Sequence, residues 1–261
     1  MYKITPQVVA FGPKREKSRF TYMHNFGEKI DVPYVSWLIQ GRDLTVLVDA
    51  GCSAEDYMRY IRPPDRPLML AGEQFANVVD VKPLEEHLRG RRLSIDDVDI
   101  VIQTHLDWDH TMGTRHFRKS KILLQRAEWA KVPVHPLFKS TYAPKFIYEE
   151  IAKLDLHLIE GDYSVAPGLE ILYTPGHSPG GQSVVVETEK GPYVIAGMCT
   201  IRENFYPPAS VLAHSEYKVI PAGMHIDPLV CYDSMLRILQ RGGERVLPFH
   251  DGSAMSMGTI G

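Results

Sequence analysis

The sequence is poor in cysteine and contains no long apolar run. Only three cysteines occur in 261 residues, Cys52, Cys199 and Cys231, and no two form a CxxC pair. A disulfide framework is therefore excluded, and a reducing cytoplasm is the expected location. No apolar run approaches the about 18 residues that a membrane span needs. Residues 1–20 lack the apolar segment of a secretory signal, so no membrane contact is expected.

The chain also lacks an excess of charge of one sign. Lysine and arginine number 29 against 32 aspartates and glutamates, which gives a net charge of −3. A nucleic-acid partner bound through a basic face is therefore not expected. The hydrophobic share of 44% is sufficient for one sizeable core. We expect a single domain over residues 1–261.

Short apolar runs alternate with helix-like segments along most of the chain. Residues 33–40 and 44–49 flank a turn composition and predict a hairpin. Further apolar runs between turn signals predict strands at 99–103, 121–125, 169–173, 183–187, 193–196 and 245–248. Capping residues or helical periodicity predict helices at 81–89, 94–97, 126–130 and 227–240. The alternation indicates an α/β or α+β protein.

Two proline-rich segments, residues 57–80 and 132–148, show no clear periodicity. Long irregular loops often shape binding pockets. Four aromatic residues in them suggest a mostly apolar pocket wall, although packing within the loop or core is the commoner role: Phe75, Tyr142, Phe146 and Tyr148. A small, uncharged, hydrophobic electrophile is the substrate expected for such a wall.

Four potential metal ligands lie within six positions, directly after a predicted buried strand. They are His105, Asp107, Asp109 and His110, in the pattern H-x-D-x-D-H. A loop at the end of a strand can direct several side chains to one centre, and imidazole and carboxylate bind zinc, manganese or iron. A polar surface loop with helix-capping aspartates is the simpler alternative for any one of them, but a less natural explanation for all four.

Two further histidines lie in separate segments. His177 stands in the rigid sequence TPGHSPGG, and His250 follows a predicted strand in PFHD. Either one alone is a weak signal, because histidines are common in turns. Three strand ends that carry histidines together favour a metal site.

These motifs resemble the metallo-β-lactamase superfamily, whose usual first motif is H-x-H-x-D-H. The turn Asp49-Ala50-Gly51 looks like that family's early D-x-G, and the resemblance runs from about residue 33 to 251. It implies a four-layer αββα sandwich with the metals at one edge between two sheets. Residues 123–128 and 202–205 are similar to the acyl-homoserine-lactone lactonase branch.

The resemblance also implies a ligand set. It assigns three residues to a first metal: His105, Asp107 and His177. It assigns three to a second metal: Asp109, His110 and His250. The family's bridging aspartate is missing here, because the chain reads Ala196-Gly197-Met198-Cys199. Since thiolate binds zinc well, Cys199 is the candidate replacement, although a small buried strand residue is an equally good interpretation of it.

The tyrosine that assists the leaving oxygen in such lactonases is also missing. Thr200 or Ile201 occupies its place, and Tyr206 is nearby but displaced. The two positions most closely tied to lactone chemistry are therefore both altered.

The expected function is a metal-dependent hydrolase that activates water on a binuclear zinc centre. Asp109 is the expected catalytic residue, because it can orient the nucleophile and carry its proton. The expected substrate is a lactone of the acyl-homoserine type, and an isothiocyanate that would release an amine is the alternative. Iron is possible, because Asp107 adds a carboxylate. An iron-dependent redox enzyme and a non-enzymatic binding module stay open, as does a homodimer.

Overall fold

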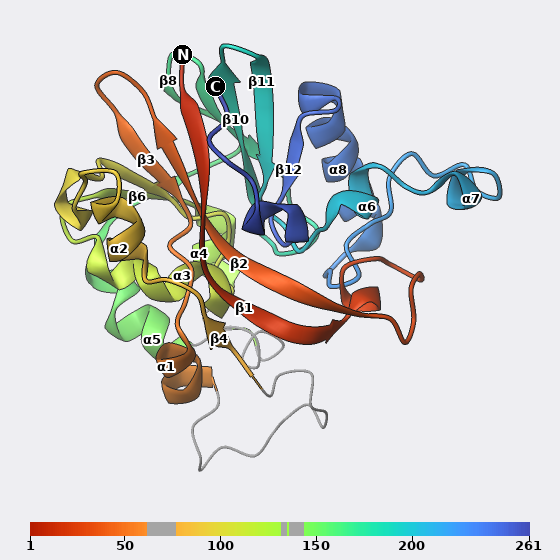
Figure 1. Cartoon of the computed structure of the whole chain (residues 1–261), viewed down its shortest axis with the longest axis horizontal. Helices are drawn as coiled ribbons and strands as arrows, with labels where there is room; N and C mark the ends of the chain where they lie inside the picture. The colour runs from red at the N-terminus through yellow and green to blue at the C-terminus, as the bar shows by residue number, and fades with distance from the viewer. Residues whose placement is uncertain (62–76, 132–134, 136–143) are drawn as a thin grey trace.

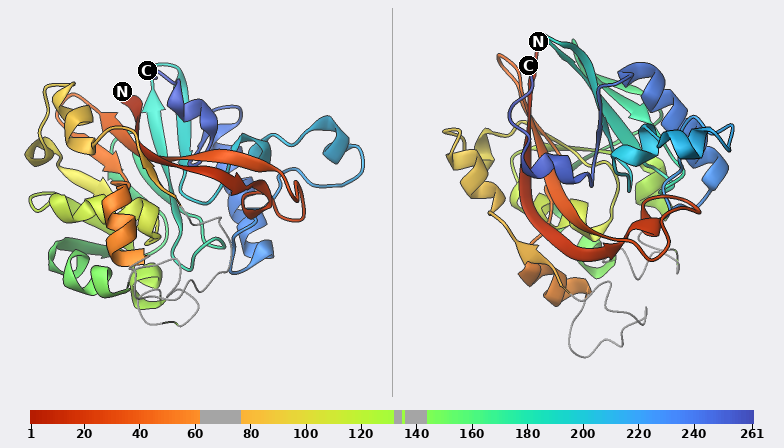
Figure 2. Two further views of the ribbon diagram at one scale, coloured as in Figure 1. Left: turned by 60° about the horizontal axis from the view of Figure 1, so that its bottom comes forward. Right: turned by 45° about the vertical axis from the view of Figure 1, so that its right-hand side comes forward.

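The structure is a computed structural model that describes residues 1–61, 77–131, 135 and 144–261. Two β-sheets lie face to face, and helices cover the outer face of each sheet (Figures 1 and 2). The predicted αββα sandwich is therefore confirmed.

The first sheet combines an antiparallel half with a parallel half. Its order in the described residues is β4-β1-β2-β3-β5-β6-β7. Strands β1, β2 and β3 pair antiparallel, and β3, β5, β6 and β7 pair parallel. The strand bounds are β1 Lys3–Glu16, β2 Lys29–Gln40, β3 Thr45–Val48, β4 Val79–Asp80, β5 Ile100–Ile102, β6 Lys121–Gln125 and β7 Asp155–Ile159. The predicted hairpin is present, with Gln40 opposite Thr45.

The second sheet comes from the C-terminal half of the chain. Its order is β12-β11-β10-β9-β8, antiparallel except for the parallel pair β11 and β12. The strand bounds are β8 Tyr163–Ala166, β9 Leu169–Tyr173, β10 Gln182–Thr188, β11 Gly191–Ala196 and β12 Val246–Pro248.

The described helices are short, except for one. Those associated with the first half of the chain are α1 Ala54–Asp56, α2 Leu84–Arg89, α3 Trp108–Thr111, α4 Arg126–Lys131 and α5 Pro144–Glu149. Those of the second half are α6 Arg202–Phe205, α7 Ala209–Leu212 and α8 Pro228–Gly242. The Asp227 side chain caps α8 by accepting hydrogen bonds from the N–H groups of Leu229 and Val230. No helix among the described residues is long and apolar enough to cross a membrane.

The layers are held together by three groups of buried apolar side chains. One fills the space between the two sheets and includes Trp37, Ile102 and Phe249. A second lies between the first sheet and its helices, and a third lies between the second sheet and α8. Burial of these side chains fixes the two sheets against each other, which brings the strand ends at one edge together.

The structure differs from the predicted elements at several places. Strand β1 was not predicted, because a buried strand of 14 residues shows no alternation of polar and apolar side chains. Helix α2 begins at Leu84 rather than at residue 81. The segment 57–80 is not wholly irregular, since a helical turn covers Tyr57–Ile61 and β4 ends it. Residues 62–76 lie outside the described residues.

Candidate metal centre

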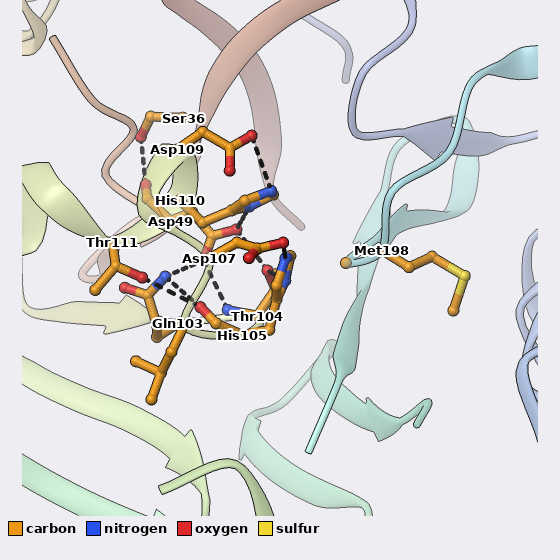
Figure 3. A network of polar contacts seen from close by, with 12 residues as sticks. Ser36, Asp49, Gln103, Thr104, His105, Asp107, Asp109, His110, Thr111 and Met198 are labelled. Carbon is orange, nitrogen blue, oxygen red and sulfur yellow. Dashed lines mark hydrogen bonds and ion pairs between the residues drawn. The ribbon is translucent and has the colours of Figure 1, made fainter. Parts of the chain in front are cut away.

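The predicted ligands meet at one edge of the sandwich. His105 and Asp107 follow β5, Asp109 and His110 lie on α3, His177 follows β9, and His250 follows β12. Six of the seven predicted ligands fall into two groups of three, and within each group the ligand atoms lie within 4.8 Å of one another. Figure 3 shows four of these side chains side by side.

The first group contains His105, Asp107 and His177. The two Nε2 atoms are 3.2 Å apart, and Asp107 Oδ2 is 3.4 Å from each of them. Asp107 Oδ1 is buried and has no hydrogen-bond partner among the described residues. Burial lowers the pKa of His177, but its contact with Asp107 outweighs burial and the net shift is upward.

The second group contains Asp109, His110 and His250. The two Nε2 atoms are 3.3 Å apart, and Asp109 Oδ2 is 3.7 Å from each. Asp109 and His110 come from α3 and His250 from the end of β12, and the two rings are buried.

Hydrogen bonds on the far side of the rings fix which nitrogen carries the proton. Nδ1 of His177 donates to the carbonyl oxygen of Met224 at 2.7 Å, and Nδ1 of His250 donates to that of Pro33 at 3.1 Å. Nδ1 of His110 donates to Asp49 Oδ2 at 2.6 Å. In each ring Nε2 therefore keeps a lone pair directed at its partner ring.

The fourth ring follows the same rule through a hydroxyl. Thr104 Oγ1 donates to Asp49 Oδ2 at 2.6 Å, so its oxygen accepts the Nδ1 proton of His105 at 2.9 Å. Within each group, two nitrogen lone pairs thus face each other at little more than 3 Å. A cation between them turns this repulsion into attraction, and this donor set fits a divalent metal ion in each group.

Asp49 organises the polar contacts behind the ligands. Its carboxylate accepts hydrogen bonds from Gln103 Nε2, Thr104 N, Thr104 Oγ1 and His110 Nδ1 (Figure 3). Its backbone has a φ of 57°, which aspartate tolerates better than most residues. Burial raises the pKa of Asp49 to about 7. The D-x-G turn therefore places a fully buried carboxylate behind His110.

Glu128 is a positioning residue that the sequence indicated only through the resemblance. Its fully buried carboxylate accepts hydrogen bonds from the N–H groups of Leu106 and Gly180, at 2.9 Å and 2.8 Å. It therefore ties the H-x-D-x-D-H loop to the loop that carries His177. Gly180 has no space for a side chain, since an added Cβ would lie 2.3 Å from the Glu128 backbone nitrogen.

Burial sets the ionisation of the ligands. It lowers the pKa of His105, His110 and His250 to about 4, so these rings are neutral at pH 7. It raises the pKa of Asp109 to about 6. Burial acts in the same direction on Asp107, but hydrogen bonds with the two neighbouring imidazoles outweigh it and hold the pKa of that carboxyl below its usual range. Neutral imidazoles and ionised carboxylates are the forms that bind metals.

Cys199 does not join either group of ligand atoms. It is buried and lines the same cavity as Asp107 and Asp109, and burial raises the pKa of its thiol well above the usual value. What separates Cys199 from the ligands is geometry, because its sulfur atom lies outside both groups of converging ligand atoms. Met198, which occupies the place of the family's bridging aspartate, turns its side chain away from the ligands (Figure 3) and packs in the core of the second sheet. No described side chain replaces that bridge.

The candidate replacements for the missing tyrosine acid make other contacts. Thr200 Oγ1 donates to the Met198 carbonyl, and Ile201 packs in the core. Tyr206 donates its hydroxyl proton to the Gly243 carbonyl and accepts from the Val246 N–H, far along the chain from the ligands.

A cavity opens onto the ligands. It is lined by Arg15, Arg19, Phe20, Val32, Tyr34, Asp107, Trp108, Asp109, Cys199, Met224 and His250. The predicted aromatic wall is wrong for Phe146, which is buried in the core beside the first sheet, and Tyr148 is exposed. Phe75 and Tyr142 lie outside the described residues. The β1–β2 ribbon supplies the wall instead, and the sequence did not predict this because β1 shows no alternation of polar and apolar residues.

Comparisons with known proteins agree with this geometry. The family model described as "Metallo-beta-lactamase superfamily" matches residues 30–250. An N-acyl homoserine lactonase of Agrobacterium fabrum is 30% identical over 191 residues, which cover 69% of this chain and 68% of that protein. An N-acyl homoserine lactonase of Bacillus cereus is 40% identical over 112 residues, which cover 42% of each chain.

Solved structures show the same fold. The structure of an N-acyl homoserine lactone hydrolase with the product N-hexanoyl-L-homoserine at its metal centre has a TM-score of 0.72 and 23% identity, covering 98% of this chain and 94% of that one. The matched residues include every ligand of both groups, from His105 to His250. The chain therefore belongs to the metallo-beta-lactamase superfamily.

Proposed function

We propose that this protein is a zinc-dependent hydrolase that opens lactones. The observation that carries the proposal is the pair of converging ligand groups, in which Asp107 directs Oδ2 at two imidazole nitrogens and keeps a buried Oδ1 without a partner among the described residues. A buried carboxylate oxygen without a partner costs free energy unless a cation binds it. The lactone class is supported by the relatives in Bacillus and Agrobacterium, which are named N-acyl homoserine lactonases.

Bound zinc ions would supply a nucleophile at neutral pH by lowering the pKa of water, and would polarise the carbonyl group of the substrate. His105, Asp107 and His177 would hold the first ion, while Asp109, His110 and His250 would hold the second. We assign a second role to Asp109, which is proton transfer, because its carboxyl lines the cavity as well as belonging to the second ligand group.

Zinc is proposed over iron because four neutral imidazoles form most of the ligand set. Asp107 adds a carboxylate where the family usually has histidine, and this favours iron more than the usual set does. If the purified protein were coloured and contained iron, an iron-dependent redox enzyme would be supported instead. If the purified protein contained no metal, a non-enzymatic binding module would be supported.

Isothiocyanate hydrolysis is a second candidate. Threonine and isoleucine side chains are not acids of useful strength, and the Tyr206 hydroxyl donates to the Gly243 carbonyl, so Thr200, Ile201 and Tyr206 offer no counterpart of the family's tyrosine acid. Attack on the carbon of an N=C=S group needs no such acid.

We further propose that residues 1–261 form one domain and that the protein is a homodimer. A cytoplasmic location is also proposed, and the three free cysteines are consistent with it.

Metal analysis by mass spectrometry, together with the visible spectrum, is the first test. Two zinc ions per chain without colour, and turnover of lactones that is lost in His110→Ala and Asp109→Ala, is the expected result. Turnover of an aryl isothiocyanate but of no lactone would replace lactones by the second candidate. Folded, metal-loaded variants with full activity would overturn the proposed mechanism.

A further inference from the structure

The cavity beside the ligands contains a buried tyrosine hydroxyl, that of Tyr34. The residue lies on β2 and is 4% exposed. Among the described residues that line the cavity, which include Asp109 and His250, Tyr34 is the only one whose side chain carries a hydroxyl. It belongs to neither ligand group, and none of the ligand motifs contains it.

The neighbours of Tyr34 fix its position relative to the second ligand group. The carbonyl of the preceding residue, Pro33, accepts the Nδ1 proton of His250 at 3.1 Å, so β2 is tied directly to a ligand. The Tyr34 ring makes T-shaped contacts with the rings of Trp108 and His250, at centroid distances of 5.2 Å and 6.2 Å. Trp108 directly precedes Asp109 on α3. The phenol ring is therefore held beside the elements that supply the second ligand group.

The Arg15 guanidinium determines how the Tyr34 hydroxyl can act. Nη2 of Arg15 donates to the Tyr34 oxygen at 3.3 Å and to the Asn77 carbonyl at 2.7 Å. Because a guanidinium has donors and no acceptor, Tyr34 cannot donate its own proton to Arg15. Within the part of the chain that the structure describes, this proton has no acceptor. A buried donor without an acceptor costs free energy, which an oxygen atom of a substrate in the cavity would recover.

Strand β1 leaves room for these two side chains. Its pairing with β2 is shifted between Gly12 and Arg15, and bulges of this kind redirect side chains next to functional sites. A Cβ added to Gly12 would lie 2.5 Å from the Tyr34 hydroxyl oxygen and 2.3 Å from Arg15 Nε. The absence of a side chain at Gly12 therefore allows the hydroxyl and the guanidinium to meet at this place.

Burial keeps the Tyr34 hydroxyl protonated. Burial raises the pKa of this group well above its usual value; Arg15 acts in the opposite direction, and Asp109 adds to the rise. The phenol is therefore neutral at pH 7 and keeps its proton. A neutral phenol is a hydrogen-bond donor, so it can stabilise an oxygen that becomes negative.

Opening of a lactone ring places negative charge on two oxygens, that of the carbonyl group and that of the alkoxide that leaves. The proposed metal centre accounts for the carbonyl oxygen. The hydroxyl protons of Thr200 and Tyr206 are donated to the backbone carbonyls of Met198 and Gly243, so they are not available to the leaving oxygen. The Tyr34 hydroxyl lines the cavity and is available.

We propose that the Tyr34 hydroxyl donates a hydrogen bond to the leaving oxygen of the lactone and that Arg15 positions the hydroxyl for this contact. The oxygen of water forms the new bond to the carbonyl carbon, and the ring C–O bond breaks. A proton of that water passes through Asp109 to the leaving oxygen, which becomes the hydroxyl group of the product. Tyr34 keeps its own proton and stabilises the charge while the bond breaks. This inference rests on the proposed hydrolase function.

The test compares two substrates that differ in one ring atom, N-hexanoyl-homoserine lactone and N-hexanoyl-homocysteine thiolactone, on the metal-loaded enzyme. A thiol has a pKa of about 8.5 and water one of about 15.7, so a thiolate leaves with little help, whereas an alkoxide needs a donor. Tyr34→Phe should lower kcat for the lactone by about 100-fold or more, and for the thiolactone by less than about tenfold. Equal losses for the two substrates, or no loss for the lactone, would overturn the inference.

Further variants separate this role from general damage. Gly12→Ala keeps the hydroxyl but displaces it, and should show the same selective loss as Tyr34→Phe. Arg15→Met leaves the hydroxyl without its orienting donor and should show a smaller loss that is again selective for the lactone. Arg15→Lys should recover part of that loss, because the ammonium group is also a donor. Tyr163→Phe removes a hydroxyl from an exposed residue of β8 and should change neither rate. An Arg15→Met variant that slows both substrates equally would overturn the positioning role.

A binding measurement keeps this inference distinct from the proposed function. Calorimetry compares N-hexanoyl-homoserine, the product of ring opening, with N-hexanoyl-2-aminobutyrate, which lacks only the hydroxyl group. The wild type should bind the product more tightly by about threefold to tenfold, the range for one neutral hydrogen bond, and Tyr34→Phe should lose this preference. A preference that depends on Tyr34, without turnover of any lactone, would leave the contact standing and remove the hydrolase. Lactone turnover with an equal preference in both proteins would retain the hydrolase and overturn the inference.

Discussion

The Nδ1 atom of His110 donates a 2.6 Å hydrogen bond to Oδ2 of Asp49, a residue that lies 61 positions earlier in the chain. This bond directs the Nε2 lone pair of His110 toward the second ligand group. Asp49 lies just beyond the end of β3 and His110 lies on α3, so the contact joins the D-x-G turn to the H-x-D-x-D-H motif. A short turn that binds no metal itself thereby controls a ligand.

Replacing Asp49 by asparagine should weaken metal binding at the second group. The asparagine amide would place an N–H donor where Thr104 and His110 also donate. Loss of a partner that orients a ligating histidine typically lowers metal affinity by about 10-fold to 100-fold, and we expect a loss of that order here. Competition with a chelator, followed by metal analysis, measures the change. Asp155→Asn, which alters an exposed aspartate beside His157, is the matched control and should leave affinity unchanged.

Two substitutions of Asp107 test the proposed metal site formed by His105, Asp107 and His177. Asp107→Ala should lose one of two metal ions, because it removes the carboxylate oxygens that face both imidazoles. Asp107→His should keep both ions, because an imidazole at this place is the usual ligand of the family. Metal content of the two purified variants decides the matter, and an unchanged metal content in Asp107→Ala would contradict the assignment.

Replacing Cys199 by alanine should leave the metal content at the wild-type value. Its sulfur atom is in neither ligand group, and burial keeps the thiol protonated. The measurement is metal analysis after dialysis against a weak chelator. Selective loss of one ion would instead restore Cys199 as the replacement for the bridging aspartate.

Glu128→Ala should destabilise the metal-free protein by about 1–3 kcal/mol, because it leaves the buried N–H groups of Leu106 and Gly180 without an acceptor. Urea unfolding measures the change. Glu160→Ala removes an exposed carboxylate and should alter the free energy of unfolding by less than about 0.5 kcal/mol.

The carboxyl group of Glu128 should also make the free energy of unfolding depend on pH. Burial raises the pKa of Glu128 from 4.5 to about 7 in the folded protein, so the folded state holds this proton more tightly than the unfolded state. The stability of the wild type relative to Glu128→Gln should therefore be highest below pH 4.5 and should fall as the pH rises to about 7. Parallel urea titrations of the two metal-free proteins between these limits measure the difference. A difference that stays constant, or one that grows with pH, would contradict the shift.

Much of the fold was accessible from the local sequence. The apolar runs predicted β5, β6, β9, β10, β11 and β12 within one or two residues of their ends. The hairpin of β2 and β3 was found from its turn residues. Strand β1 was missed because it is buried along most of its length, and a strand covered on both faces shows no period of two. Its bulge depends on pairing with β2, which no local pattern reveals.

The candidate site, like the fold, was predictable from the sequence only in part. The residue types and their spacing by themselves pointed to His105, Asp107, Asp109, His110, His177 and His250, because ligand chemistry is a property of side chains. Their spacing did not divide these six residues into two groups, which only the family resemblance implied, and the tertiary structure forms the same two groups where the ends of β5, β9 and β12 meet α3. It also decided the outcome for Cys199 and Met198, because a side chain's direction at a strand end follows from the packing around it. The wall of the cavity was also decided only by the tertiary structure, because Tyr34 on β2 and Asp107 after β5 come together through the packing of the sheets and not through their places in the chain.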